Sequence, residues 1–60
     1  MTGKQLLKEA KERGFKLIRV KGSHHILQHN DGRELNIPIH SNKDVPKGLL
    51  HSLLKILYEK

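Results

Sequence analysis

The chain has 60 residues, 35% of them apolar, and no cysteine, which predicts a single domain over residues 1–60 with a small core. Disulfides, thiol nucleophiles and cysteine-based metal sites are thereby excluded. The net charge is +6, and residues 1–22 hold seven Lys or Arg against two Glu, so a polyanion, above all nucleic acid, is the favoured partner.

The hydropathy pattern of the chain indicates the cellular compartment in which the protein is expected. No apolar run approaches about 18 residues, so no membrane-spanning helix is predicted. The N-terminal segment lacks an apolar stretch followed by a small-residue cleavage site, so no signal peptide is expected. The expected compartment is therefore the cytoplasm, without a membrane partner.

The first predicted element is a helix over residues 2–13. Thr2 and Gln5 stand at the spacing of a capping box, which satisfies two backbone N–H groups reciprocally. Gly14 suits the left-handed residue that follows many helices. Lysines lie largely around one side of this helix, and the opposite side carries the apolar residues Leu6, Leu7 and Ala10.

Three β-strands are predicted next, over residues 15–20, 23–29 and 33–39. The first is rich in β-formers, and Lys21-Gly22 gives a turn after it. Asn30-Asp31-Gly32 is a strong hairpin signal, because these residues tolerate positive φ. In the third strand the apolar residues alternate, which predicts one buried face formed by Leu35, Ile37 and Ile39.

A polar connection over residues 40–45 leads to a second helix, with Pro46 in its first turn. Its apolar stripe at helical spacing is read as core and comprises Leu49, Leu50, Leu53, Leu54 and Leu57. The predicted fold class is therefore α+β, a three-stranded antiparallel meander covered on one face by two helices. This is the architecture of double-stranded-RNA-binding domains, and it leaves the other sheet face open to solvent or a partner.

Histidine is abundant: the chain contains His24, His25, His29, His40 and His51. Side chains alternate along a strand, so His24 shares a face with Ile26, and His25 shares the other with Leu27. The pattern does not decide which of these two faces meets the core. His25 and His29 lie about 13 Å apart on a strand, too far for one ion, so no metal site is predicted.

The segment from Lys21 to His24 has the make-up of a phosphate-binding turn. Gly22 allows close approach of the backbone, and Ser23 offers a hydroxyl. His24 follows at the start of a strand, where its ring can be held rigidly, and Arg19 supplies further positive charge. An ordinary turn leading into a strand accounts for the same composition.

The Gly22-Ser23-His24 sequence, with Leu27 after it, resembles the G-S-H-x-x-(aromatic or aliphatic) signature of the HicA toxins. Leu27 stands where the family often has an aromatic residue, which weakens the case for base stacking there. The resemblance covers nearly the whole chain. The other residues that match the family's pattern are Gly14-Phe15, Arg19, Asp31-Gly32-Arg33, Pro38, His40, Lys43, Pro46-Lys47-Gly48 and the leucine-rich last helix.

This resemblance implies a double-stranded-RNA-binding-domain-like fold and a ribosome-independent, metal-independent endoribonuclease that cuts mRNA. The family's G-S-H histidine is needed for activity, and it corresponds to His24. The resemblance also implies a HicB-like antitoxin that covers this site, single-stranded RNA as the substrate, and no cofactor.

With RNA as substrate, cleavage is expected to proceed by attack of a 2′-hydroxyl on the adjacent phosphate. His24 is the predicted proton-transfer group, because imidazole changes charge between about pH 5 and 8. A second such group stays open between His40 and His25. The predicted contacts to RNA and its phosphates are Arg19, Lys21, Gly22, Ser23, Arg33 and Lys47.

Two other functions fit the same composition. A non-catalytic RNA-binding domain shares the fold and the charge, and a protein-interaction module could use an open sheet edge. Phe15 and Tyr58 are the only rings available for base stacking, and Phe15 is expected in the core. RNA binding is therefore predicted to depend on phosphates, with loose sequence preference and steep salt dependence.

Overall fold

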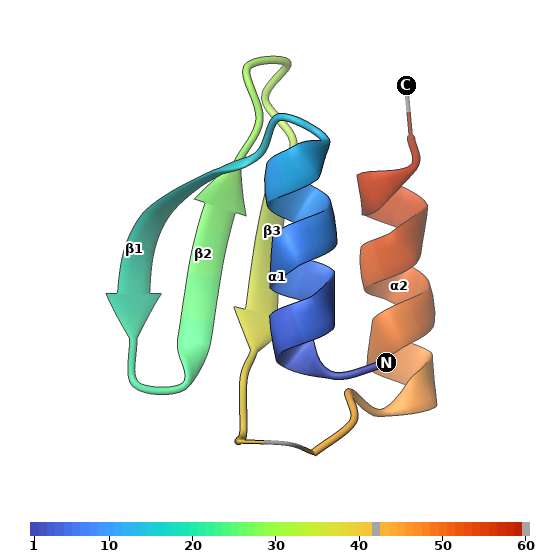
Figure 1. The fold of residues 1–60 in the computed structure, drawn as a ribbon. Helices are drawn as coiled ribbons and strands as arrows, with labels where there is room; N and C mark the ends of the chain where they lie inside the picture. The colour runs from blue at the N-terminus through green and yellow to red at the C-terminus, as the bar shows by residue number, and fades with distance from the viewer. Residues whose placement is uncertain (42, 60) are drawn as a thin grey trace.

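The chain folds in the predicted order of helix, three strands and helix, in a computed structural model that describes residues 1–41 and 43–59. The elements are α1 (Gly3–Glu12), β1 (Lys16–Lys21), β2 (His24–Gln28), β3 (Glu34–Pro38) and α2 (Lys47–Leu57). β2 is the central strand of an antiparallel three-stranded sheet, and both helices cover the same face of it (Figure 1). The predicted fold class is confirmed.

The start of α1 is fixed by the predicted capping box. The Gln5 backbone N–H donates to Thr2 Oγ1 at 3.2 Å, and the Thr2 backbone N–H donates to Gln5 Oε1 at 2.9 Å. Thr2 is thus the cap rather than the first helical residue, and α1 ends at Glu12 instead of residue 13. Gly14 has φ of 95°, the left-handed conformation expected after the helix.

The core lies between the sheet and the two helices. Leu27, not Ile26, is fully buried against the helices, which settles the face that the sequence pattern left open. In β3, Leu35 and Ile37 are fully buried as predicted, and Ile39 is half-buried beyond the strand end. The buried apolar residues are Leu6, Ala10, Phe15, Leu27, Leu35, Ile37, Val45, Leu53 and Leu57.

The connection before α2 is tied to the N-terminus of the chain. The Val45 backbone N–H donates to the Met1 carbonyl at 2.9 Å, and the Met1 amino group lies 3.6 Å from the Asp44 carboxylate. Pro46 directly precedes α2, which begins one residue later than predicted. The predicted connection also contains Asn42, which lies outside the described residues.

Candidate active site

The open face of the sheet, turned away from the helices, carries the predicted histidine. In an antiparallel sheet, residues directly opposite one another share a face. The strand register places three cross-strand rows on the open face: Lys21, His24 and Pro38; Arg19, Ile26 and Asn36; and Lys16, Gln28 and Glu34. The cations of β1 therefore stand beside the polar residues of β2 and β3.

A β-bulge in β1 creates this arrangement. Leu17 pairs with Leu27 and Arg19 pairs with Ile26, so Ile18 is an extra residue between them. In a regular strand, Leu17 and Arg19 would point the same way, and both would face the helices. The extra residue reverses the alternation, as bulges do when they re-aim a side chain. Arg19 and Lys21 thus join His24 on the open face.

The bulge was not part of the sequence prediction, although β1 carries a signal for it. Its apolar residues are Leu17, Ile18 and Val20, and its cations are Lys16, Arg19 and Lys21. Two adjacent apolar residues followed by a cation break strict alternation. A one-residue insertion restores it, because the cations then share one face and Leu17 and Val20 share the other.

His24 begins β2 directly after the turn that the sequence singled out. Gly22 has φ of 60°, and a Cβ built at this glycine would have no atom within 4 Å, so space beside the backbone is open. Ser23 is half-buried, and its carbonyl accepts the Ile39 backbone N–H at 2.8 Å. The exposed His24 ring has a side-chain partner, since Nδ1 lies 3.0 Å from Asn36 Oδ1.

The two further histidines proposed for proton transfer lie on different sides of the sheet. His25 pairs with Val20 and with the buried Ile37, which places it on the helix-covered face. Its Nδ1 lies 3.1 Å from the Ser23 carbonyl oxygen. His40 is exposed and follows β3 by two residues, at the end of the sheet where Pro38 pairs with His24.

Lys47 and Arg33, both predicted phosphate contacts, lie at opposite ends of the sheet. α2 begins with the exposed Lys47 at the lower end in Figure 1, where β2 also begins. Arg33 directly precedes Glu34, which pairs with Gln28 at the far end of β2. Four residues of strand separate Gln28 from His24, about 13 Å at 3.3 Å per residue.

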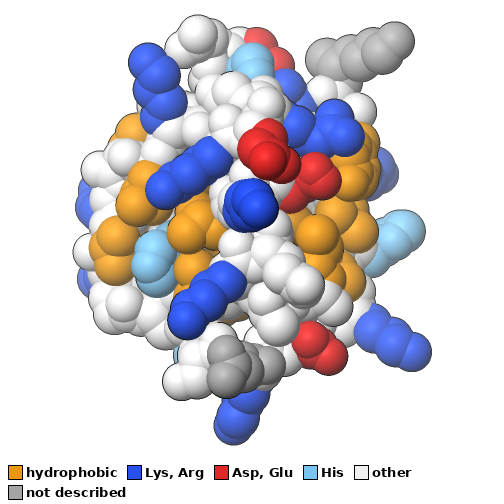
Figure 2. Space-filling model, in the orientation of Figure 1, with side chains coloured by type: hydrophobic (Ala, Val, Ile, Leu, Met, Phe, Trp, Pro, Cys, Tyr) orange, Lys and Arg blue, Asp and Glu red, His pale blue; other side chains and the backbone are white. Residues whose placement is uncertain are grey.

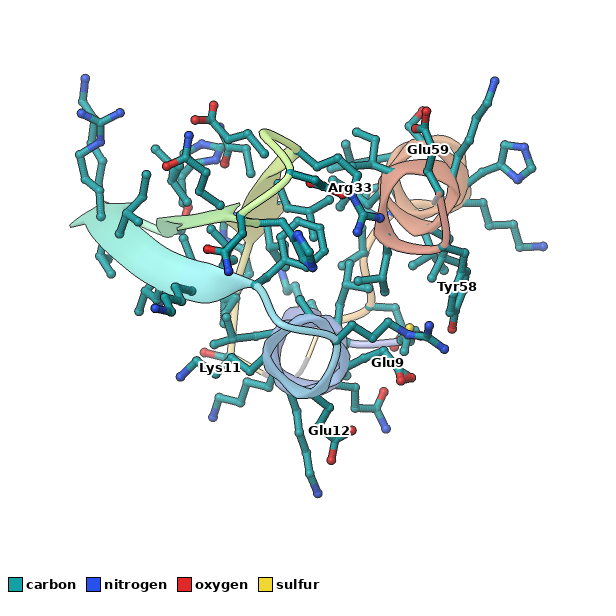
Figure 3. All side chains as sticks on the ribbon, turned by 90° about the horizontal axis from the view of Figure 1, so that it is seen from above. Glu9, Lys11, Glu12, Arg33, Tyr58 and Glu59 are labelled. Carbon is teal, nitrogen blue, oxygen red and sulfur yellow. The ribbon has the colours of Figure 1, made fainter. Side chains whose placement is uncertain are left out.

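The Arg33 guanidinium is engaged in holding the end of α2. Its Nη1 donates to the carbonyl of Ile56 at 2.8 Å and to those of Leu57 and Glu59. Its Nε donates to Asp31 Oδ2 at 2.7 Å. Figure 3 looks onto this end of the molecule and shows Arg33 reaching from the hairpin toward the last turn of α2, beside Glu59. Arg33 therefore joins the hairpin to α2.

The same end contains a second polar cluster around Phe15. His29 packs edge-on against the Phe15 ring with centroids 5.0 Å apart, and its Nε2 lies 3.1 Å from the Arg13 carbonyl oxygen. The backbone N–H of Arg33 donates to Asp31, and this bond, together with the Arg33 guanidinium and His29, holds the pKa of the Asp31 carboxyl below its ordinary 3.8. These contacts tie α1, the hairpin and α2 together.

Within residues 1–41 and 43–59, no group of three or more His, Cys, Asp or Glu side chains lies close enough to hold one ion. Over the same ranges, no helix is both long enough and apolar enough to cross a membrane. His25 and His29 share the helix-covered face, yet each ring is bonded to a different backbone carbonyl.

The open face defines a class of protein: a small basic α+β domain that presents an oriented histidine among cations, suited to a polyanionic ligand. A family model described as the HicA toxin of bacterial toxin-antitoxin matches residues 3–57. The chain therefore belongs to the HicA toxin family, as the sequence resemblance indicated, and is the toxin of a toxin–antitoxin system. A comparison with curated proteins gives no significant match.

Proposed function

We propose that this toxin is a cytoplasmic endoribonuclease that cuts single-stranded mRNA, independently of ribosomes and of metal ions, and that a HicB-like antitoxin neutralises it. The observation that carries the proposal is the position of His24, exposed on the open face with Lys21 directly opposite and Arg19 in the next row. An imidazole that can exchange a proton near neutral pH, surrounded by cations, suits reaction at a phosphodiester.

In the proposed reaction, the RNA 2′-oxygen attacks the adjacent phosphorus and loses its proton to a base. The new bond is 2′-oxygen to phosphorus, the broken bond is phosphorus to 5′-oxygen, and the 5′-oxygen leaves with a proton. His24 is the residue we assign to proton transfer. A single positioned group of this kind contributes about 10²–10⁴-fold in rate. An all-DNA oligonucleotide, which has no 2′-hydroxyl, should stay uncut.

The phosphate contacts that we propose lie on the open face and at the turn beside His24. Arg19 and Lys21 supply positive charge, and the open backbone at Gly22 with the hydroxyl of Ser23 would receive the phosphate. Lys47 extends this set from the start of α2 at the same end of the molecule. Arg33 is left out, because its guanidinium already bonds α2 and Asp31.

We favour His40 over His25 as the second proton-transfer group. His40 is exposed at the end of the sheet that carries His24. His25 is half-buried on the helix-covered face, and its ring is bonded to a backbone carbonyl oxygen. A His40→Ala variant should therefore lose more RNA cleavage than a His25→Ala variant, once both rates are corrected for the fraction of folded protein.

Binding is proposed to rest on phosphates rather than on bases. The three described rows of the open face contain no Phe, Tyr or Trp, and Ile26 is the apolar residue at their centre. Apart from the His24 ring, which is assigned to proton transfer, these rows offer no aromatic ring on which bases of single-stranded RNA could stack. We therefore expect loose sequence preference and an affinity that falls steeply with salt.

The antitoxin is proposed to cover the open face and the basic side of α1 with an acidic surface. Lys and Arg side chains, with some acidic side chains among them, lie over α1, and apolar surface is exposed on both sides (Figure 2). A shallow groove of about 460 Å³ on this side of α1 is lined by Lys4, Leu7, Lys8, Lys11 and Glu12. The neighbouring β1 exposes apolar side chains as well, namely Leu17, Ile18 and Val20. Apolar surface rimmed by cations fits an acidic protein partner.

The proposed function is tested by inducing the chain alone in cells and following growth and mRNA integrity. His24→Ala is the test variant. His51→Ala, which removes an exposed histidine from α2, is the matched control. Wild type and the His51 variant should stop growth with loss of mRNA, and the His24 variant should do neither. Arrest without RNA loss in the wild type would support the non-catalytic RNA-binding alternative instead.

A further inference from the structure

Asn36 occupies a strand position for which its residue type is poorly suited. Asparagine is depleted in β-strands, because its side chain competes with the backbone for hydrogen bonds. Asn36 nevertheless stands in the middle of β3, between Leu35 and Ile37, which are both fully buried on the helix-covered face. Its side chain therefore lies on the open face, where a locally unfavourable residue calls for a specific contact.

That contact is with the ring of His24. Asn36 pairs with Ile26, and His24 pairs with Pro38, so Asn36 and His24 are diagonal neighbours on adjacent strands. Diagonal positions of this kind are close enough for side chains to meet. Asn36 Oδ1 lies 3.0 Å from His24 Nδ1. An amide oxygen only accepts hydrogen bonds, so the proton of the neutral ring sits on Nδ1 and the lone pair on Nε2.

We propose that Asn36 is a positioning residue, which fixes the tautomer and the direction of the His24 ring so that Nε2 faces the RNA as the proton acceptor. The inference rests on the proposed function, since it assigns the ring atom that performs the proton transfer. Without a partner, an exposed histidine samples several rotamers and both tautomers. The bond from Nδ1 removes this freedom before substrate arrives.

The neutrality of Asn36 matters as much as its acceptor oxygen. The charged groups nearest to His24 on the open face are the cations Lys21, directly opposite on β1, and Arg19 in the next row. Lys16 and Glu34 stand one row further along the same face, and His25 lies on the other face. A carboxylate at position 36 would also accept from Nδ1, but it would stabilise the protonated ring and repel an RNA phosphate. An amide orients the ring without either effect.

The test compares pH–rate profiles of RNA cleavage for wild type, Asn36→Ala, Asn36→Asp and Gln28→Ala. Gln28→Ala is the matched control, because it removes an exposed amide from the same face, four residues away from His24. Ordering partners behind metal-bound histidines change activity by about 10–100-fold, and we expect Asn36→Ala to lower kcat by a similar factor. Asn36→Asp should recover most of the lost kcat at high pH. The acidic limb of its pH–rate profile should lie about one pH unit higher than in the wild type.

Nitrogen NMR of the His24 ring gives a readout independent of catalysis. At a pH where the ring is neutral, the wild type should carry its proton on Nδ1, and Asn36→Ala should shift toward the Nε2–H form that free imidazole favours. Unchanged cleavage and an unchanged tautomer in Asn36→Ala would overturn the inference and leave the proposed function standing. Full activity of His24→Ala would instead overturn the proposed function, and the NMR readout would still decide whether Asn36 orients the ring.

Discussion

Both ends of the sheet carry histidine and cationic side chains, which are bonded within the fold at the hairpin end and largely exposed at the other end. At the hairpin end, Asp31 bonds to both Arg33 and His29. Arg33 in turn bonds to backbone carbonyls in the last turn of α2, and His29 to the Arg13 carbonyl just after α1. At the other end, Lys21 and His40 are exposed, and in the described part of the chain their side chains make no hydrogen bond or ion pair. The His24 ring there has one side-chain hydrogen bond, which it donates to the neutral Asn36.

The contrast separates polar residues that hold the fold from polar residues that remain available to a ligand. A guanidinium with several carbonyl partners has little capacity left for a phosphate, and its loss leaves those partners unsatisfied. A cation without a partner contributes little to folding and remains available to a ligand. Variants at the hairpin end should therefore change the free energy of unfolding, and variants at the His24 end should change RNA cleavage.

The largest expected effect on stability is that of Arg33→Ala. The variant removes the charged group that donates hydrogen bonds to carbonyls in the last turn of α2. Hydrogen bonds to charged groups contribute about 1.5–3 kcal/mol. We expect a loss of about 2–3 kcal/mol in the free energy of unfolding, measured by chemical denaturation. Arg19→Ala, a surface substitution on the open face, should stay within about 0.5 kcal/mol. A similar loss in both variants would show that the two ends of the sheet do not differ in their contribution to stability.

Gly14→Ala comes next in size and tests the packing beneath the hairpin. Gly14 has φ of 95°, and a Cβ would lie 3.0 Å from His29 Nε2. The left-handed conformation costs about 1–2 kcal/mol for a residue with a side chain, so thermal unfolding should shift downward accordingly. Gly48→Ala in α2 is the control, because a Cβ there meets nothing within 4 Å. An unaffected Gly14 variant would contradict the predicted cost of a left-handed backbone at this corner.

How much of this could be predicted from the sequence differs between the fold and the site. Periodicity and turn signals predicted every element to within two residues, because the apolar pattern of α1, β3 and α2 agrees with local capping and turn chemistry. The bulge at Ile18 was not predicted, because the residue types of β1 are equally compatible with a regular strand. The bulge nevertheless moves the Arg19 side chain from the helix-covered face to the open face. The carbonyl partners of Arg33 come from α2, more than 20 residues away in the sequence, which no local pattern reports.

Asp31 gives a smaller, pH-dependent effect at the hairpin end. Its pKa is held down mainly by the backbone N–H of Arg33, so the carboxylate stabilises the folded protein at pH values above its ordinary pKa. This contribution is lost as the pH falls through the lowered folded-state pKa. The difference in the free energy of unfolding between wild type and Asp31→Asn should therefore be full at neutral pH and disappear as the pH falls below about 4. Chemical denaturation at a series of pH values measures this difference. A gap that widens in acid would contradict this sign.

The smallest effect belongs to a single cation at the His24 end. Lys21→Ala should lower the slope of log affinity against log salt for a single-stranded RNA by about one, as expected when one phosphate contact is lost. Lys55→Ala, an exposed lysine of α2 in its last turn, is the matched control and should leave the slope unchanged. Equal slopes for wild type and the Lys21 variant would remove Lys21 from the phosphate contacts.

We propose that the end of the sheet with His24 acts on RNA and that the end with Arg33 holds the fold. The most direct test measures initial cleavage rate per folded molecule and denaturant midpoint for purified His24→Ala and Arg33→Ala, with Arg33→Lys as a milder variant. We predict that His24→Ala keeps its midpoint and loses at least about 10²-fold in rate, and that the Arg33 variants unfold earlier but cleave normally while folded. Normal cleavage by His24→Ala, or a fully stable but inactive Arg33→Ala, would show that this division between the two ends is wrong.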